Sequence, residues 1–488
     1  MVVGDSGLVV DRARLVGSTV RLVGPWVVAS VAFLVYATYS LTRFRTGHMS
    51  GYDLGIFTQV VSRYADLQAP DIGVKLGWNA LGDHFSPALA LLAPFYRLVP
   101  RPQTLLVAQA ALTAVSVVPV TRAAGRVVGP RAGLLVGVAY AGSYGLQSMI
   151  GFDFHEVALA VPCLAFGLER HLNGDSRRAA VLLGLLVFVK EDLGVTVLLF
   201  AIVLAFRGER RLAAALAAWA GTWFVLATAV IIPALSPDGT YRYFHHFVQN
   251  GSLGLTPHRL LSMAASDGRA HLLIVLLLTG VFIAVRSPLA LLTLGTLSWR
   301  LASQGPGYMD THVHYDAVLM PIVFMASLDA LRALQSRPTL GRLLRRGYPW
   351  AAATVMVVLT VAAYPFPRLL QPGFYAPGPQ VASVQRLLSH VPHRAGIRTD
   401  NNLVPLMVSR NEVTMLYATH PNTPVGQWLI TDLSGCSLNA PLAWKQAYLN
   451  ALAPYTLHTW RDGSVELVEL NPGTPAAPTG VTRSYDLC

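Results

Sequence analysis

Charged side chains are scarce in this sequence. Asp, Glu, Lys and Arg make up 13% of its 488 residues, whereas hydrophobic residues make up 53%. An average soluble protein carries about 25% charged residues, so this composition argues against a soluble fold. Zinc-finger spacings and basic stripes interleaved with aromatic residues are also lacking. We therefore expect no nucleic-acid partner, despite a formal net charge of +12.

Cysteine is nearly absent as well, since only Cys163, Cys436 and Cys488 occur. Cys163 lies in an apolar run, where a thiol packs as a small hydrophobic group. Cys436 and Cys488 fall in a polar C-terminal region and could form a disulfide if that region lies outside the cell. Their spacing does not decide whether they pair.

Long apolar runs, by contrast, recur between Pro25 and Pro365. A membrane-spanning helix needs about 20 predominantly apolar residues. The sequence therefore predicts a polytopic α-helical membrane protein with about eleven transmembrane helices. Their approximate bounds are 23–42, 103–121, 132–149, 157–171, 179–190, 193–206, 212–233, 271–285, 288–303, 315–332 and 349–365.

Arginine clusters predict the orientation of these helices. They fall in alternate connections, as at 122–131, 170–178, 207–211 and 332–346, while the other connections are poor in arginine. Because cytoplasmic loops of membrane proteins carry an excess of Lys and Arg, we expect the N-terminus to be cytoplasmic. An odd number of helices then makes the C-terminal region extracytoplasmic.

The predicted transmembrane domain, 1–365, contains a long first outer loop at 42–102. Within it, apolar residues recur at helical spacing over Asp53–Leu67, which predicts an amphipathic helix on the bilayer surface. Ser86–Pro100 is apolar but too short to span, and prolines interrupt it. We expect a re-entrant or surface-lying helix there.

The pattern changes after Pro365. Residues 366–380 are rich in Pro and Gly and predict a linker, followed by a small α/β domain at 381–471 and a flexible tail at 472–488. The domain should contain helices near 381–390, 402–410 and 441–452, strands near 396–399, 413–417 and 428–431, and a hairpin turn at Asp462-Gly463.

Ionisable residues gather in the predicted outer loops. A charged group at membrane depth costs about 2.5–3.5 kcal/mol on insertion scales, so such residues are candidates for function. The five groups are Asp53; Asp83 and His84; Asp153, His155 and Glu156; Lys190, Glu191 and Asp192; and His312, His314 and Tyr315. If the topology is right, all five lie on one membrane face.

Several of these residues also have purely structural interpretations. Asp53 can cap the amphipathic helix, and Glu156 is favoured at a helix start by the helix dipole. Lys190 can neutralise Glu191 or Asp192. His312 and His314 can be interfacial side chains.

Capping does not explain Asp83 and His84. The following Ser86-Pro87 pair already supplies a cap residue and a first helical turn. A role in a site is therefore favoured for these two residues.

Several short segments resemble, in this order, a bacterial family of multi-spanning membrane proteins. It is the domain-of-unknown-function family numbered two-zero-seven-nine. The matching segments are DLGIF at Asp53–Phe57, GDHFSP at Gly82–Pro87, FDFHE at Phe152–Glu156, KEDLG at Lys190–Gly194 and the pair His314-Tyr315. That family in turn resembles the GT-C glycosyltransferases, which transfer a sugar from a polyprenyl-phosphate carrier on the outer membrane face.

The resemblance implies a GT-C-like fold in the bacterial plasma membrane. In GT-C enzymes an acidic residue follows the first helix, and Asp53 occupies the matching position. They also have a membrane-hugging loop helix, which Ser86–Pro100 resembles, and commonly an extra outer C-terminal domain. The implied partners are a polyprenyl-phosphate-linked sugar, membrane lipid and an envelope glycan or glycolipid acceptor. This sequence departs from the pattern because no Asp-Glu or Asp-x-Asp pair occurs at Asp53.

By this analogy we expect an inverting glycosyltransferase with Asp53 as general base. Its expected catalytic residues are Asp53, Lys190, Asp83 and His84, and its expected substrate-binding residues are Asp153, His155, Glu156, Glu191, Asp192, His312, His314 and Tyr315. No cofactor is required. A divalent cation on the acidic and histidine side chains stays open, because no spacing marks a metal site.

Two rival interpretations remain. A transporter or lipid flippase would place polar groups near the membrane midplane, often in repeated halves. Here the ionisable residues favour one face and no repeat is evident. A non-catalytic envelope assembly protein would use the C-terminal domain as a binding module.

Overall fold

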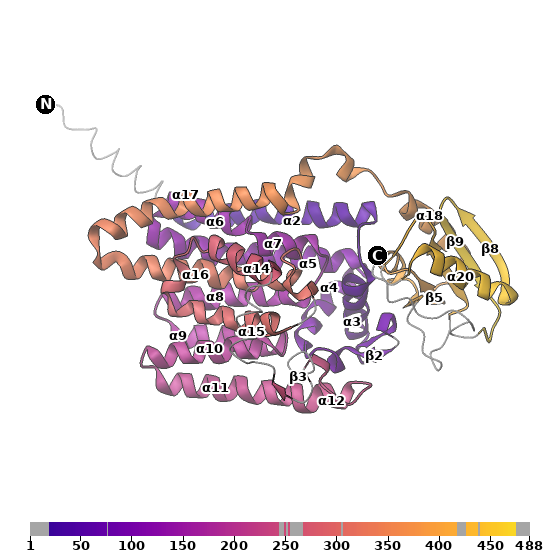
Figure 1. The fold of residues 1–488 in the computed structure, drawn as a ribbon, viewed down its shortest axis with the longest axis horizontal. Helices are drawn as coiled ribbons and strands as arrows, with labels where there is room; N and C mark the ends of the chain where they lie inside the picture. Colours follow the sequence, from indigo (N-terminus) through magenta and orange to yellow (C-terminus); the bar gives the residue numbers. More distant parts are fainter. Residues whose placement is uncertain are drawn as a thin grey trace.

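The computed structural model describes residues 19–75, 77–243, 248–249, 252–253, 267–303, 306–416, 426–437 and 440–474. It consists of a helical part followed by a smaller C-terminal domain built on a mixed sheet (Figure 1). The possible pairing of Cys436 with Cys488 lies outside the described residues, because Cys488 falls after 474.

Several helices of the helical part are strongly apolar. Within the described ranges, four helical stretches are long and apolar enough to cross a membrane: Gly24–Thr46, Pro102–Val128, Arg210–Leu235 and His314–Ser336. The second and fourth are mostly buried inside the protein, whereas most of the third is exposed. The exposed apolar surface of such a helix is suited to lipid contact.

Helix α5, Pro102–Val128, lies at the centre of the helical part. It packs against α2, Gly24–Thr46, and against α6, α8 and α16. The other main helices are α6 Pro130–Ala141, α7 Tyr144–Gly151, α8 Ala160–Leu172, α9 Ser176–Gly184, α10 Leu193–Phe206, α11 Arg210–Val225, α12 Ile232–Leu235, α14 Asp267–Thr279, α15 Leu294–Ala302, α16 Leu319–Ala333 and α17 Pro338–Ala363.

The prediction of one continuous helix over 132–149 is wrong. The chain leaves the helical conformation at Ser143, whose ψ is 146°, and α7 starts at Tyr144. The side chain of Gln147 donates a hydrogen bond of 2.6 Å to the carbonyl of Gly142. This bond satisfies a backbone group that the break leaves without a helical partner.

The last apolar helix starts earlier than 349, since α17 begins at Pro338 and accommodates Pro349 in its interior. Proline at Pro338 is suited to a helix start, because its missing N–H would have no partner there.

The first loop folds into short elements between α2 and α5. They are η1 Gly51–Gly55, α3 Ile56–Ala65, β1 Asp71–Ile72, η2 Gly73–Lys75, β2 Trp78–Asn79, η3 Ala80–Gly82, η4 Pro87–Leu92 and α4 Ala93–Leu98. Helix α3 forms where the sequence predicts it, but its predicted place on the bilayer surface is wrong. Val60 and Val61 are buried, and Gln59 donates a 3.1 Å hydrogen bond to the carbonyl of Val413 in the C-terminal domain. Helix α3 is therefore enclosed by protein.

The segment η4–α4 agrees with the expectation of a short, non-spanning helix. Leu91, Phe95 and Leu98 are 67%, 60% and 81% exposed. The opposite face buries Leu89, Leu92 and Tyr96. Such an amphipathic segment is typical of a helix at a membrane interface.

The C-terminal domain contains a five-stranded sheet in the order β6-β5-β7-β9-β8. The three strands β6, β5 and β7 are parallel, whereas β9 pairs antiparallel with β7 and β8. Strand bounds are β5 Gly396–Thr399, β6 Glu412–Met415, β7 Trp428–Asp432, β8 Thr456–Asp462 and β9 Val465–Leu470, and the helices are α18 Pro379–Leu387, α19 Val404–Met407 and α20 Leu442–Leu452. The structure confirms the predicted hairpin turn, which Gly463 closes with φ +61°.

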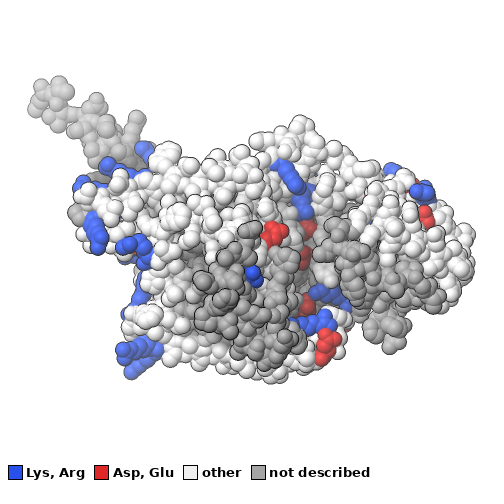
Figure 2. Space-filling model, viewed as in Figure 1, with Lys and Arg blue, Asp and Glu red and all other residues white. Residues whose placement is uncertain are grey.

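Charge is distributed unevenly over the molecule. On the face in Figure 2, Lys and Arg are the charged side chains at the end of the helical part that lies far from the C-terminal domain, and a further group of them lies near the junction. The Asp and Glu side chains visible on the helical part lie nearer the junction with that domain.

Candidate functional site

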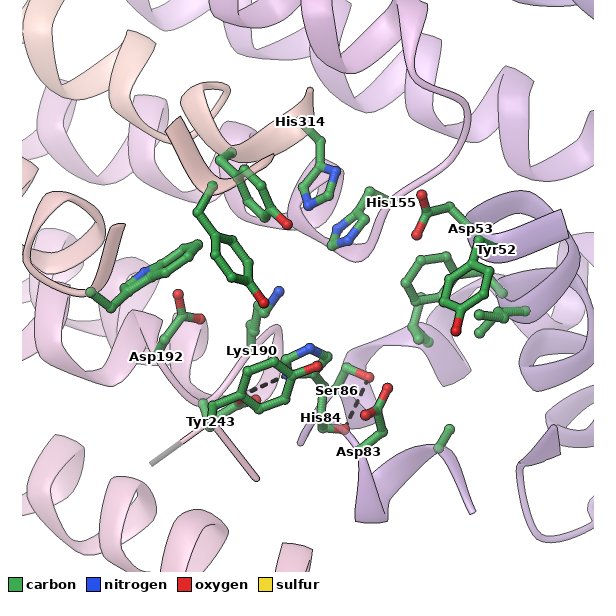
Figure 3. Close-up of a pocket in the computed structure, with 18 of the residues that line it drawn as sticks. Tyr52, Asp53, Asp83, His84, Ser86, His155, Lys190, Asp192, Tyr243 and His314 are labelled. Atoms are coloured by element: carbon green, nitrogen blue, oxygen red, sulfur yellow. Dashed lines mark hydrogen bonds and ion pairs between the residues drawn. The ribbon is translucent and has the colours of Figure 1, made fainter. Parts of the chain in front are cut away.

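A cavity of about 760 Å³ lies beside the junction of the helical part and the C-terminal domain (Figure 3). Six stretches of the helical part line it, together with one residue of the C-terminal domain, Asn401; the stretches lie within 50–89, 152–155, 190–195, 224–243, 295–303 and 308–315. Nine of the expected site residues line this cavity: Asp53, Asp83, His84, His155, Lys190, Glu191, Asp192, His314 and Tyr315.

Asp53 lies in η1, a single π-helical turn that follows the end of α2. Ser50 caps this turn by accepting a 3.1 Å hydrogen bond from the backbone N–H of Tyr52. In the part of the chain that the structure describes, the Asp53 carboxylate makes no hydrogen bond or ion pair. Burial, followed by the negative charges of Asp153 and Glu156, raises the pKa of Asp53 to about 7. A carboxylate with this proton affinity can act as a base near neutral pH.

Asp153 does not line the cavity but supports the turn that carries Asp53. Its carboxylate pairs with Arg43 at 2.9 Å and accepts a 2.8 Å hydrogen bond from the N–H of Ser50. Its φ of +95° is unusual for a residue other than glycine. Burial raises the pKa of Asp153 to about 6, even though Arg43 and Ser50 lower it. Asp153 therefore holds the loop in place rather than facing a ligand.

Gln109 of α5 holds the segment from Met149 to His155 in place through its side-chain amide. Its amide donates to the carbonyls of Met149, at 3.2 Å, and Asp153, and accepts a 3.0 Å hydrogen bond from the N–H of His155. A side-chain amide has a donor and an acceptor at one end, so one residue pins both sides of the loop. The ring of His155 is thereby held at the cavity wall.

His155, Glu156 and Lys190 form a chain of close contacts. Nδ1 of His155 lies 2.7 Å from Oε2 of Glu156, and Nζ of Lys190 lies 3.1 Å from Oε1 of the same carboxylate. Glu156 is buried behind the wall, while the other two residues line the cavity. Lys190 forms its ion pair with Glu156. It therefore does not pair with Glu191 or Asp192, which was the structural alternative from the sequence. The pair with Glu156 fixes the ammonium group in the wall.

The rings of His155 and His314 stack with centroids 3.4 Å apart. Neither ring nitrogen of His314 has a hydrogen-bond partner among the described residues. Both nitrogens are buried, although the residue lines the cavity.

His84 occupies another part of the wall. Its Nδ1 lies 2.8 Å from Oε1 of Glu191, which also accepts a 3.2 Å hydrogen bond from the hydroxyl of Tyr241. The second carboxylate oxygen accepts from the N–H of Phe85 at 3.0 Å. Burial and Lys190 lower the pKa of His84, but the carboxylates of Glu191 and Asp83 outweigh them and raise it above its usual value. His84 is therefore disposed to carry a positive charge.

Asp83 pairs with Lys75 at 2.5 Å. Although burial acts to raise it, His84 and Lys75 together bring the pKa of Asp83 below its ordinary value. Asp83 is thus a fixed negative charge that holds Lys75 at the cavity.

Asp192 lies across the cavity from Asp53, with Lys190 between them in Figure 3. Oδ1 of Asp192 is buried and has no hydrogen-bond partner within the described ranges. The wall nearby is aromatic, and Trp299, Tyr308 and Tyr315 pack edge-to-face or tilted with centroids 5.3–5.7 Å apart. Aromatic side chains of this kind offer a large apolar surface on this side of the cavity.

His312 is the expected site residue that lies away from this cavity. It is exposed, its Nδ1 lies 2.9 Å from Oδ1 of Asp310, and its ring stacks on Tyr364. The nearby Asp316 forms a completely buried ion pair with Arg300, in which a guanidinium nitrogen lies 2.5 Å from Oδ1. The loop that carries His314 and Tyr315 is held by this pair.

Sequence reasoning missed several residues of the site. Lys75 and Tyr243 line the cavity, as does Asn401, while Arg43 and Gln109 support it. A polar Gln109 inside an otherwise apolar helix was a usable signal. Nothing local to Lys75 or Asn401 distinguishes them from surface residues.

The described residues contain no group of three or more His, Cys, Asp or Glu side chains arranged to hold a metal ion. Several of the acidic and histidine side chains around the cavity are instead held in separate pairs, such as Asp83 with Lys75 and His84 with Glu191.

No curated protein matches this sequence. The crystal structure of ArnT from Cupriavidus metallidurans in the apo state is similar in fold, with a TM-score of 0.51 and 15% sequence identity. The match covers 91% of this chain and 97% of that chain. The chain therefore has an ArnT-like fold. The family model described as "Predicted membrane protein (DUF2079)" matches residues 46–465, and the chain therefore belongs to the DUF2079 family.

Proposed function

We propose that this protein is a membrane glycosyltransferase that moves a sugar from a polyprenyl-phosphate carrier to an envelope glycan or glycolipid. The observation that carries the proposal is Asp53, a carboxylate free of hydrogen bonds and ion pairs among the described residues, which faces a cavity in a GT-C-like fold. Fold similarity by itself does not establish an activity. The proposed chemistry therefore rests on the residues of the cavity.

The proposed orientation places about eleven helices in the bacterial plasma membrane, with the N-terminus in the cytoplasm. The basic end of the helical part supports this orientation, because Lys and Arg favour the cytoplasmic side. The cavity and the C-terminal domain then lie on the extracytoplasmic side. The exposed apolar residues of η4–α4 would rest at the outer membrane interface.

The donor would enter with its lipid tail along the membrane and its phosphate-sugar head in the cavity. Lys190 is held in position by Glu156, and His84 is disposed to be protonated. Cations held at fixed positions stabilise negative charge without reorganising during the reaction, and such stabilisation often contributes more to catalysis than any other effect. Lys190 and His84 are accordingly the proposed partners of the phosphate.

Asp53 would remove the proton from the attacking hydroxyl group of the acceptor. The acceptor oxygen then forms a bond to the anomeric carbon, while the bond from that carbon to the phosphate oxygen breaks and its electrons stay on the carrier phosphate. A single displacement of this kind inverts the anomeric configuration. Asp53 must approach the hydroxyl to about 2.6–3.2 Å, directly or through one water.

Asp53→Asn tests the proposal, with Asp66→Asn as the matched control. Asp66 lies in the same loop, is exposed and is outside the cavity. Loss of a general base lowers rates by about 10²–10⁴-fold, so Asp53→Asn should abolish detectable transfer in reconstituted membranes while Asp66→Asn retains it. Retained transfer in Asp53→Asn would refute the role of Asp53.

Product analysis separates this function from lipid transport. A glycosyltransferase forms a new glycosidic bond, whereas a flippase changes only the membrane leaflet of an unchanged lipid. Lipid and envelope-glycan profiles of wild-type and Asp53→Asn strains, measured by mass spectrometry, should differ by the absence of one glycosylated product. A difference in sidedness alone would identify a transporter. Transfer measured with and without a chelator decides whether a divalent cation takes part.

A further inference from the structure

The C-terminal domain reaches the cavity through the segment that follows strand β5. Asn401 lies two residues after the strand ends at Thr399, is 7% exposed and lines the cavity. Ligands of α/β sheets commonly bind outside the carboxyl ends of parallel strands. The end of β5 thus faces the helical part where a ligand would lie.

Asn401 contacts the turn that carries Asp53 through two hydrogen bonds. Its carbonyl accepts a 2.7 Å bond from the N–H of Gly51, and its Nδ2 donates a 3.0 Å bond to Oγ of Ser50. Ser50 is itself the cap of that turn. Asn401 therefore holds the backbone just before Asp53 in place through hydrogen bonds to Ser50 and Gly51.

The packing around these bonds leaves no room for a side chain. A Cβ added at Gly51 would lie 2.6 Å from Cβ of Val404 and 2.7 Å from the carbonyl oxygen of Asn401. A Cβ added at Gly55 would lie 2.5 Å from Cγ1 of Val404. The two glycines of the turn therefore permit helix α19 to pack directly against it.

A buried polar network holds the other side of Asn401. The carboxylate of Asp400 accepts hydrogen bonds from the hydroxyl of Thr431 at 2.9 Å and from the N–H of Asp432 at 2.7 Å, and pairs with Lys445 at 3.1 Å. Asp400 and Lys445 are both almost completely buried. A satisfied network of this kind rigidifies its surroundings, so the domain presents Asn401 from a fixed base.

The side-chain amide of Asn401 still has one hydrogen-bonding atom to spare. Its Oδ1 is buried without a partner within the described ranges. If the amide is turned over, the hydroxyl of Ser50 can donate to Oδ1 of Asn401, because Oγ of Ser50 still accepts its hydrogen bond from Tyr52. The amide nitrogen is then the atom without a partner. In either orientation one amide atom is left for a group inside the cavity.

We propose that Asn401 is a positioning residue through which the C-terminal domain completes the site, fixing the turn that presents Asp53. This inference rests on the proposed function for its meaning in catalysis, but the contact itself can be tested without a substrate. Removing the amide would loosen the turn and admit water beside the Asp53 carboxylate.

The experiment measures how the Asp53 side chain titrates in the full-length protein in lipid nanodiscs. Carbodiimide modification of Asp53 is followed by mass spectrometry between pH 5 and 9, in the wild type, Asn401→Ala, Asn401→Asp and the control Asn450→Ala. Asn450 is an exposed asparagine of α20 in the same domain. In the wild type the midpoint should lie near 7, because burial raises the pKa of Asp53 to about 7.

Asn401→Ala should lower the midpoint and increase the extent of modification, because water reaches the carboxylate. Asn401→Asp keeps the size of the side chain but adds a negative charge, so its midpoint should rise. Opposite shifts are not expected from a general loss of structure. Asn450→Ala should match the wild type. If Asn401→Ala fails to fold, the near-isosteric Asn401→Asp carries the test.

A midpoint in Asn401→Asp equal to that of Asn450→Ala would overturn the inference. Transfer assays on the same variants separate this result from the proposed function. If the wild type transfers no sugar but the two Asn401 variants shift the Asp53 midpoint in opposite directions, the glycosyltransferase proposal is refuted and the positioning role is retained. If the wild type transfers sugar but the variants do not shift the midpoint, the positioning role is refuted and the glycosyltransferase proposal is retained.

Discussion

Asp53 and Asp192 differ from the other carboxylates around the cavity in having no hydrogen-bond or ion-pair partner among the described residues. Asp83 is paired with Lys75, Glu191 with His84 and Asp153 with Arg43. Asp53 has burial and nearby negative charge instead, and both favour its protonated form. At the scale of single residues, the site combines neutralised pairs with two unpaired carboxylates, of which Asp53 has its pKa raised to about 7 and can exchange a proton near neutral pH.

A pH dependence follows from the raised pKa of Asp53. The base must be ionised, and ionisation increases as the pH rises through about 7. We therefore expect kcat/KM for sugar transfer to rise about tenfold per pH unit below 7 and to fall again at higher pH, where His84 loses its proton. A rate profile of reconstituted protein between pH 5 and 9 measures this. A profile that stays flat from pH 5 to 8 would contradict the assignment of Asp53 as base.

The sequence predicted the groups of this site better than their contacts. Asp83, His84, His155 and Lys190 could be found because ionisable residues between apolar runs are unusual. The roles of Arg43 and Asn401 could not be found, since their partners lie 110 and 351 positions away. No local pattern encodes such a distance. His312 was misleading because a histidine next to a site residue can point elsewhere.

At the scale of elements, the decisive contact lies between the turn η1 and helix α19. Both are short, and neither would be stable alone, because a single turn bears the cost of helix nucleation without further hydrogen bonds. The sequence predicted helical structure near both but not their packing. The sequence also failed to predict the break before α7. Apolar periodicity continues through this segment, but the side chain of Gln147 takes the place of a helical hydrogen bond at Gly142.

A pair of substitutions tests this contact. Gly55→Ala places a methyl group 2.5 Å from Cγ1 of Val404 and should lower the thermal midpoint and transfer. Val404→Ala removes the clashing atom at a cost of about 1–3 kcal/mol, because Val404 is fully buried. The double variant should be more stable than the sum of the two single effects predicts. A double-mutant cycle on thermal unfolding measures the coupling, and strict additivity would argue against the close contact.

At the scale of the whole molecule, the uneven charge was the most readable feature of the sequence. Arginine clusters recur at the end far from the C-terminal domain, and the structure gathers them there (Figure 2). A small α/β domain was also predictable, because strands and helices alternate at 396–452, whereas the mixed order of its sheet was not predicted. The enclosure of α3 was not, since an amphipathic pattern reports that one face is apolar without saying what covers it.

Labelling of introduced cysteines tests the proposed orientation. Asn450→Cys in the C-terminal domain should react with a membrane-impermeant maleimide on intact cells. Arg211→Cys, in a predicted inner connection, should react only after permeabilisation. The unsubstituted chain reports the background from its own three cysteines. Labelling of Arg211→Cys but not Asn450→Cys on intact cells would invert the topology.

The contact between Ser50 and Asn401 joins positions 351 residues apart. Because Asn401 is synthesised long after Ser50, this separation determines when the cavity can be complete. A ribosome adding about 5–20 residues per second takes roughly 18–70 s to cover that distance. During this interval the helices can already enter the bilayer, while the part of the cavity wall that Asn401 supplies beside Asp53 does not yet exist. Under the proposed function, activity would begin only after the C-terminal domain has folded against the turn, so a product truncated before Asn401 should be inactive in the membrane.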